Sequence, residues 1–212
     1  MQGDKMSQIY VTKLREDIVA LAKHNNLILA IAIDQFAENP REWDNLGTMV
    51  CFHKRYILGD QNHGYRAEDF NSWDEVRDAI IKNENPVLIY PLYLFDHSGL
   101  TIQIGPFNGP DAVWDSGQVG YIYTTKDAIR KHYQTKRVTQ RYIKLADTIL
   151  REEVKIYDAY LKGEVYLFIL EDKDGNLINS CGGFYGNDFD KNGIREHLGE
   201  YAYLLDYLEP VR

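Results

Sequence analysis

The stretch 90-YPLYLFDHSGLTIQIGPFNGPDAVWDSGQVGYIY-123 decides the fold of this 212-residue chain. The apolar run Val87 to Phe95 is typical of a strand, Ser98-Gly99 signals a tight turn, and Leu100 to Ile104 returns as a hairpin partner. After a loop, Gln118 to Tyr123 forms a further apolar run. Short apolar runs joined by turn residues predict a sheet dominated by antiparallel strands.

Helical periodicity is strongest in the second half of the chain. One long amphipathic helix is expected from about Val138 to Leu161, ended by Gly163. Its apolar residues recur three, four or seven positions apart: Val138, Tyr142, Leu145, Ile149, Ile156 and Tyr160. Ser72 and Glu75 form the capping-box pattern of another helix. Shorter helices are predicted over three stretches: Ser72 to Glu84, Lys126 to Tyr133 behind a Thr124 or Thr125 cap, and Ile194 to Leu208.

The start of the chain also shows helical spacing. Thr12 suits an N-cap, and Leu14, Ile18 and Leu21 follow at helical intervals, so a helix is expected up to about His24. Further strands are predicted at Leu27 to Ile33, Thr48 to His53, Val165 to Leu170 and Leu177 to Tyr185. The simplest architecture is one α+β domain over residues 1–212, with about four helices and an antiparallel-dominated sheet.

The chain is acidic, with 24 Lys and Arg against 32 Asp and Glu and a net charge of −8. A nonspecific nucleic-acid binder normally carries a basic face, so that role is disfavoured, although a smaller basic patch is compatible with the composition. Acidity suits contact with a basic partner surface, and it also favours solubility.

No apolar run approaches the ~20 residues of a membrane span. Cys51 and Cys181 form no CxxC motif and no secretory signal is recognised, so both are expected to be reduced, cytoplasmic thiols.

Two polar-aromatic clusters stand out in the sequence. The first surrounds a predicted strand: Trp43, Asp44, His53, Arg55, Tyr56 and Asp60. The second lies at strand ends in residues 90–123: Asp96, His97, Ser98, Trp114, Asp115 and Ser116. Because loops at strand ends gather into pockets, we expect these side chains to converge into one ligand-binding site at a sheet edge.

The residue types in these clusters suit binding. Arg55, beside a histidine and aromatic rings, suits a phosphate or carboxylate with a stacked base. The alternative is that Arg55 pairs with Asp44 or Asp60 and fixes the loop. Trp114 could stack on a base or fill a gap under its own loop.

Catalytic patterns are weaker. Asp96, His97 and Ser98 are the residue types of a hydrolytic triad, but neighbours in one turn cannot converge as a triad requires. The alternative role for Asp96 and Ser98 is to hydrogen-bond the turn backbone. A metal site would combine Asp96 and His97 with a third residue: His53, His63 or Asp115. No HxxxH, HExxH or HxH spacing supports it, so we expect no metal and no cofactor, and an enzymatic role is less favoured than binding.

Several sequence blocks carry a family resemblance: 43-WDNLGTMVCFHKRY-56, 58-LGD-60, 91-PLYLFDHSG-99, 114-WDSGQVGYIY-123 and 181-CGGFYG-186. On these blocks most of the chain resembles a family of small bacteriophage and mobile-element proteins without an assigned activity. Ile57 departs from the usual polar residue of that family. The segment Asn108 to Val113 is longer than the usual Cys-Pro before the tryptophan, which alters a loop beside the expected site.

The resemblance, the acidity and the polar-aromatic clusters predict a phage accessory protein that antagonises host defence by binding in the host cytoplasm. It would either sequester a nucleotide-like small molecule or inhibit a host defence protein directly. The alternatives are a small hydrolase acting through Asp96, His97 and Asp115, and a structural or assembly protein of the phage. Formation of a homo-oligomer is left open.

Overall fold

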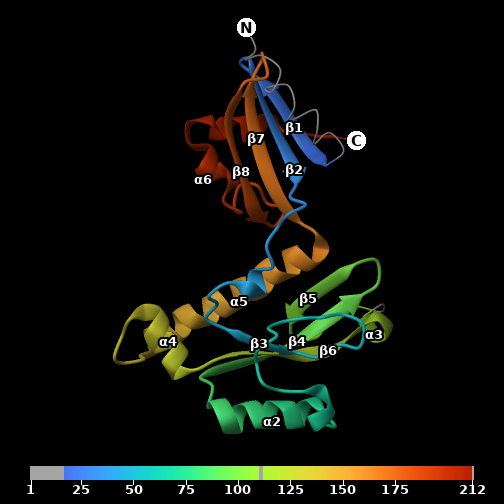
Figure 1. The fold of residues 1–212 in the computed structure, drawn as a ribbon, viewed down its shortest axis with the longest axis vertical. Helices are drawn as coiled ribbons and strands as arrows, with labels where there is room; N and C mark the ends of the chain where they lie inside the picture. Colours follow the sequence, from blue (N-terminus) through green and yellow to red (C-terminus); the bar gives the residue numbers. More distant parts are fainter. Residues whose placement is uncertain (1–16, 110–111, 212) are drawn as a thin grey trace. The chain divides into compact units, whose positions relative to one another are not determined.

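A computed structural model describes residues 17–109 and 112–211 of the protein. The chain divides into two compact units, each built around its own sheet (Figure 1). Unit 1 comprises Met1–Glu38 and Gly163–Arg212, and unit 2 comprises the intervening Asn39–Lys162. The two polar-aromatic clusters both belong to unit 2.

Unit 2 contains a four-stranded antiparallel sheet in the order β3-β6-β4-β5. Its strands are β3 (Thr48–Cys51), β4 (Leu88–Asp96), β5 (Leu100–Ile104) and β6 (Ser116–Thr124). Its helices are α2 (Trp73–Glu84), α3 (Ala112–Asp115), α4 (Lys126–Tyr133) and α5 (Gln140–Lys162), with 3-10 turns η2 (Pro40–Glu42) and η3 (Ala67–Asp69). The predicted hairpin and the strand that follows it are therefore confirmed.

Helices cover both faces of this sheet (Figure 1). Residues of α4 and α5 pack over one face, where Leu150 and Ile122 belong to the same core cluster. Residues of α2 pack against the other face, where Val76 and Tyr121 belong to a second core cluster. Side chains alternate between the two faces of a strand, so a sheet covered on both sides needs apolar residues at successive positions.

The helix starts follow the predicted capping patterns. The Ser72 hydroxyl accepts a hydrogen bond from the N–H of Glu75 at the start of α2 (3.3 Å). Thr125 caps α4 in the same way through the N–H of Ala128 (3.1 Å). Each side chain satisfies one of the N–H groups that a helix start leaves without an intrahelical partner.

The long helix α5 confirms the predicted amphipathic helix, but its buried face differs from the predicted one. Leu150 is fully buried, whereas Leu145 is 41% exposed and Ile149 is half-buried. Ala146 and Glu153 occupy the centre of the buried face. Alanine and glutamate do not stand out in a search for regularly spaced large apolar residues. The predicted apolar positions therefore lie at the side of the buried face and not at its centre.

Replacing Leu150 by Ala is expected to lower the free energy of unfolding by about 2–5 kcal/mol, because truncation of a fully buried side chain leaves a cavity. Ile149→Ala changes the neighbouring, half-buried position and should cost less. Urea denaturation of both variants, followed by circular dichroism, gives the two values. Equal costs would contradict the assigned face of α5.

Strand β6 is irregular beside the polar-aromatic residues. Leu92 pairs with Gly120 and Tyr93 pairs with Gln118, so Val119 is an extra residue in the strand. A bulge of this kind changes the direction of the side chains next to it. It therefore helps to set how Ser116 and Gln118 are presented at the end of the strand.

β5 is an edge strand of the sheet in unit 2, and α5 contacts its free edge. The N–H of Ile102 donates to Asp158 Oδ1 on α5 (2.8 Å). The other carboxylate oxygen of Asp158 accepts from Lys162 Nζ (2.6 Å). A backbone donor that has no neighbouring strand is thus bonded to a side chain.

Unit 1 contains a five-stranded antiparallel sheet in the order β8-β7-β2-β1-β9. Its strands are β1 (Ile18–His24), β2 (Leu27–Ile33), β7 (Val165–Asp172), β8 (Leu177–Tyr185) and β9 (Glu209–Pro210). The helix α6 (Ile194–Leu198) and the 3-10 segment η4 (Gly199–Tyr207) contribute to a core with the sheet (Figure 1). Leu29 and Phe168 are among its fully buried side chains.

The helix predicted at the start of the chain is wrong over Ile18–His24, which forms β1. A tight turn at Asn25 and Asn26 connects β1 to β2, and their φ angles of 49° and 63° lie in the left-handed region. Asparagine tolerates this conformation, and two such residues make the hairpin turn that matches strand twist. Pairing with β2 therefore outweighs the helical spacing. Thr12 and Leu14 lie outside the described residues.

The helix predicted from Ile194 to Leu208 is instead a short α-helix followed by a 3-10 segment. Gly199 has a φ of 56°, and this positive φ, which glycine adopts without steric cost, ends α6.

The α+β class, the antiparallel pairing and the long helix of 23 residues are confirmed, although the described residues form two sheets. The prediction of one domain over residues 1–212 stays a prediction.

Cys51 is a buried free thiol and Cys181 a half-buried one, as predicted. Burial raises the pKa of Cys51 to about 12. Across the described ranges, no helix is both long and apolar enough to cross a membrane.

Candidate functional site

The loop after β3 is held by the imidazole of His53. Its Nδ1 accepts hydrogen bonds from the N–H groups of Arg55 and Tyr56 (3.3 Å each). The rings of His53 and Tyr56 are stacked, with centroids 4.9 Å apart and an interplanar angle of 8°. One side chain thus fixes both the turn and the orientation of Tyr56.

Asp96, at the end of β4, receives two side chains from this loop. Arg55 Nη2 forms an ion pair with Asp96 Oδ2. The Tyr56 hydroxyl donates to the same carboxylate at 3.2–3.3 Å. The Arg55 side chain is still 68% exposed, so its guanidinium lies at the surface with one partner already in place.

His97 and Asp115 form a second pair at this end of the sheet. His97 Nδ1 lies 2.8 Å from Asp115 Oδ2, and both side chains are partly exposed. Asp115 ends α3, directly before β6. The pair therefore connects the β4–β5 turn to the end of α3, directly before β6.

The two polar-aromatic clusters meet in an open depression of about 320 Å³. It is lined by His53, Arg55, Leu94, Asp96, Trp114, Asp115, Ser116, Gly117, Gln118 and Val119. Trp114 is 88% exposed, so the alternative that it fills a gap under its loop is wrong. An indole in this position is available to a partner or a ligand.

The charge of the depression is slightly negative. One arginine lines it against two aspartates, and Arg55 is already paired with Asp96. The remaining carboxylate, Asp115, is hydrogen-bonded to His97. A bound anion would therefore have to compete with Asp96 for Arg55, and a bound cation would have to compete with Arg55 for Asp96 or with His97 for Asp115.

Six predicted site residues do not line the depression: Trp43, Asp44, Tyr56, Asp60, His97 and Ser98. Of these, Tyr56 and His97 contact the lining residues Asp96 and Asp115. Asp44 is highly exposed and lies 3.6 Å from Lys131. Asp60 contacts Arg41. The alternative that Arg55 pairs with Asp44 or Asp60 is wrong, because its partner is Asp96.

Sequence reasoning missed a buried polar network centred on Arg41. Its guanidinium donates to Asp60 Oδ1 (2.7 Å) and Oδ2 (3.1 Å), to Glu153 Oε2 (3.0 Å) and to the carbonyl oxygen of Gly47 (2.7 Å). Glu153 Oε1 also accepts from the N–H of Leu46 (2.7 Å). The network ties η2, the start of β3 and the Asp60 loop to α5, which makes Asp60 a structural residue.

A signal for this network was present in the sequence. Glu153 lies on the same face of α5 as Ala146 and Leu150, and a charged residue on a buried face requires a partner. Burial raises the pKa of Glu153, and the contact with Arg41 only partly offsets this effect. Burial lowers the pKa of Arg41, but its bonds to Asp60 and Glu153 outweigh that effect, so its pKa is raised.

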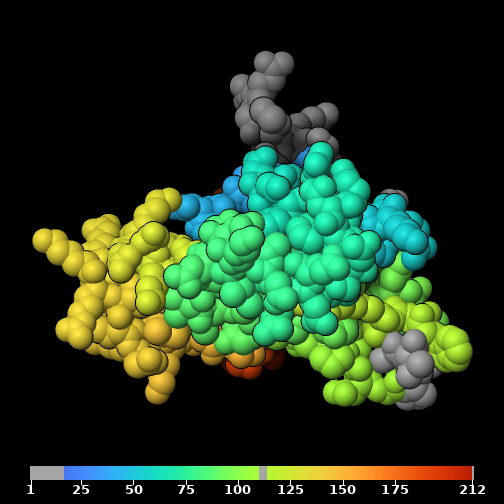
Figure 2. Space-filling model, turned by 90° about the horizontal axis from the view of Figure 1, so that it is seen from below, coloured from blue at the N-terminus to red at the C-terminus, as the bar shows by residue number. Residues whose placement is uncertain are grey.

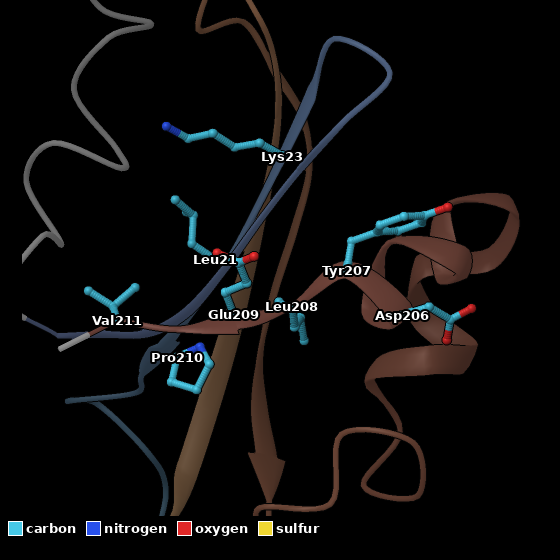
Figure 3. A pocket seen from close by; sticks show the side chains of 8 residues that line it. All are labelled: Leu21, Lys23, Asp206, Tyr207, Leu208, Glu209, Pro210 and Val211. Carbon is cyan, nitrogen blue, oxygen red and sulfur yellow. The ribbon is translucent and has the colours of Figure 1, made fainter.

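A larger hollow, of about 630 Å³, lies in unit 1 beside β9 (Figure 3). Its polar side chains include Lys23, Asp206 and Glu209. Lys23 and Asp206 point away from each other, so their charged ends do not converge on a common ligand (Figure 3). The depression in unit 2 therefore remains the better candidate.

Asp96 and His97 do not belong to a metal-binding cluster of described residues. Within residues 17–109 and 112–211, no three His, Cys, Asp or Glu side chains are placed to hold a metal ion.

Comparison of the chain with protein-family models, with curated proteins and with solved structures finds no match.

Proposed function

We propose that the protein acts by binding, and that its partner is a host defence protein that presents a basic side chain to the depression around Trp114. The observation that carries the proposal is the exposed Trp114 indole beside the carboxylates of Asp96 and Asp115. A lysine or arginine of the partner would lie over the indole as a cation–π contact and reach Asp115.

The composition of the depression supports a protein partner. Tryptophan, tyrosine and arginine are the residue types that dominate binding energy at protein interfaces. Trp114 and Arg55 line the depression, and Tyr56 contacts its residue Asp96. Small-molecule sites are usually enclosed and mostly apolar. This depression is open and largely polar, which suits an interface better than an enclosed ligand.

Charge supports a basic partner. The chain carries a net charge of −8, and the depression itself has an excess of one carboxylate. Complementary charge speeds association and disfavours partners of the same sign. The resemblance to phage and mobile-element proteins supplies the biological setting, in which the bound host protein would belong to a defence system.

Trp114→Ala is expected to weaken partner binding about 30-fold or more, the typical loss at an interface hot spot. The tagged protein would be expressed in bacteria that carry defence systems, and its stoichiometric partner would be identified by pulldown and mass spectrometry. Affinity would then be measured with the purified partner. Phe36→Ala is the matched control, because Phe36 is 94% exposed and lies in unit 1.

The expected result is loss of binding in Trp114→Ala, unchanged binding in Phe36→Ala, and affinity that falls with added salt. Recovery of no stoichiometric host protein would contradict the proposal. So would equal binding by both variants, or a partner that meets the depression with an acidic surface.

A second candidate is a nucleotide-like small molecule. The observation in its favour is the Trp114 indole beside the exposed guanidinium of Arg55, which together offer a stacking face and an anion donor. Purified protein would then carry stoichiometric material that absorbs ultraviolet light and is identified by mass spectrometry. Arg55→Lys would reduce its amount, because lysine keeps the charge but loses the planar donor pair.

A further inference from the structure

The charge of the chain is distributed very unevenly. Residues 126–144 contain seven of its 24 Lys and Arg and one of its 32 Asp and Glu. This segment therefore has a formal charge of +6, and the rest of the chain carries −14. It comprises α4, the connection to α5 and the first turn of α5. The net charge argues against a nucleic-acid role for the chain as a whole, but not for this segment.

All seven basic side chains are exposed: Lys126, Arg130, Lys131, Lys136, Arg137, Arg141 and Lys144. We call them the basic patch. Arg130 pairs with Asp127, and Lys131 lies 3.6 Å from Asp44. Among the described residues, the other five members of the patch form no ion pair. Most of this positive charge is therefore directed to solvent.

Helix electrostatics do not account for the second half of the patch. Basic residues in the last turn of α4 oppose the negative end of that helix and are stabilising there. Arg137 and Arg141 lie instead at the positive end of α5, whose first turn contains no acidic residue. Like charge at a helix start is unfavourable, so these arginines are not explained by the stability of α5.

Both tyrosines and the valine of the segment point inward. Tyr133, Val138 and Tyr142 all pack against the core of unit 2. The basic patch thus presents no free tyrosine for stacking on unpaired bases, and the exposed leucine next to it, Leu145, is too little apolar surface for insertion into a bilayer. Its exposed neutral residues are hydrogen-bonding ones: His132, Gln134, Thr139 and Gln140.

We propose that the basic patch binds the phosphate backbone of double-stranded nucleic acid without reading its sequence. Arginine, lysine, glutamine and threonine side chains are the usual partners of phosphate oxygens. α4 and the segment that follows form an exposed lobe beside α2 (Figure 2). The −14 charge on the rest of the chain would repel phosphates elsewhere and confine contact to this lobe.

The test compares two double variants with the same change in net charge. Arg137→Glu with Arg141→Glu alters the patch, and Arg77→Glu with Lys82→Glu alters exposed cations of α2 in the same unit. An acidic residue at position 141 would favour the start of α5, so the first variant should stay folded. Binding to a 20-base-pair DNA duplex of random sequence is measured by fluorescence anisotropy at several salt concentrations.

Wild type is expected to bind the duplex at low salt with steep salt dependence. The patch variant should bind at least ~10-fold more weakly, and its log–log salt slope should fall by about 2, because two phosphate contacts are lost. The α2 variant should keep the wild-type slope. Absence of binding by wild type at about 50 mM salt, or equal losses in both variants, would overturn the proposal. Binding to phosphatidylserine vesicles without binding to the duplex would overturn it as well.

Discussion

Replacing Arg41 by Met is expected to lower the free energy of unfolding by about 3–5 kcal/mol, the range for breaking a buried ion pair by removing one partner. The Arg41 side chain is only 2% exposed, and it bonds both Asp60 and Glu153. Methionine fills similar space but removes the guanidinium from two carboxylates, which keep only backbone N–H donors, and from the carbonyl of Gly47. The cost therefore arises mainly from charge that stays buried without compensation.

Urea denaturation of wild type and Arg41→Met measures this cost, with the exposed Arg77→Met as the control. The double variant Arg41→Met with Glu153→Leu should lose less stability than the two single changes added together, because it removes both halves of the Arg41–Glu153 pair. A cost for Arg41→Met below about 1 kcal/mol, the level of an exposed pair, would show that the network is solvated.

The cost of Arg41→Met should also depend on pH. Burial raises the pKa of Glu153, so the folded state holds this proton more tightly than the unfolded state. Stability from this group is therefore greatest below its unfolded pKa and decreases as pH rises through the raised value. Without Arg41 the carboxylate loses its cation, so the variant should be more strongly destabilised at pH 8 than at pH 5.

Gly120→Ala is expected to cost more than 3 kcal/mol, beyond the usual range for overpacking, and to reduce the yield of folded protein. A Cβ at this position would lie 2.0 Å from the carbonyl oxygen of Val50 and 2.9 Å from Cys51 Cα. Both are backbone atoms of β3, which pairs with β6 at this point. Relief would require β3 and β6 to separate at their pairing.

Gly117 provides the matched control, because it lies on the same strand and a Cβ there would meet nothing within 4 Å. Gly117→Ala should leave the denaturation midpoint nearly unchanged. The comparison uses soluble yield and thermal unfolding followed by circular dichroism. Similar stability of the two variants would contradict the close approach of β3 and β6.

Local sequence signals predicted the parts of the fold that depend on neighbouring residues. The β4–β5 hairpin follows from Ser98-Gly99 between two apolar runs. The Ser72 cap follows from the spacing of three residues between Ser72 and Glu75. The helix prediction at the start of the chain was wrong because the sequence from Ile18 to His24 is compatible with both a helical and a strand periodicity. The segment forms a strand because it pairs with β2. The tight turn at Asn25 and Asn26 brings β2 alongside it.

The candidate site was predictable in its location but not in its pairings. Strand ends gathered Arg55, Asp96 and Asp115 as expected, because the topology of the sheet brings those ends together. Sequence alone could not decide which arginine meets Asp60, since any loop can supply it. The answer, Arg41, depends on how η2 packs on α5.

The bond between Ile102 and Asp158 has a consequence for self-association. The free edge of a sheet is where another chain can add a strand and begin aggregation. In β5 the N–H of Ile102 is already bonded to a carboxylate, and Lys162 places a second charge beside it. An incoming strand would have to displace α5 and leave Asp158 without its backbone donor. The edge is thus closed to strand addition by a helix of the same unit.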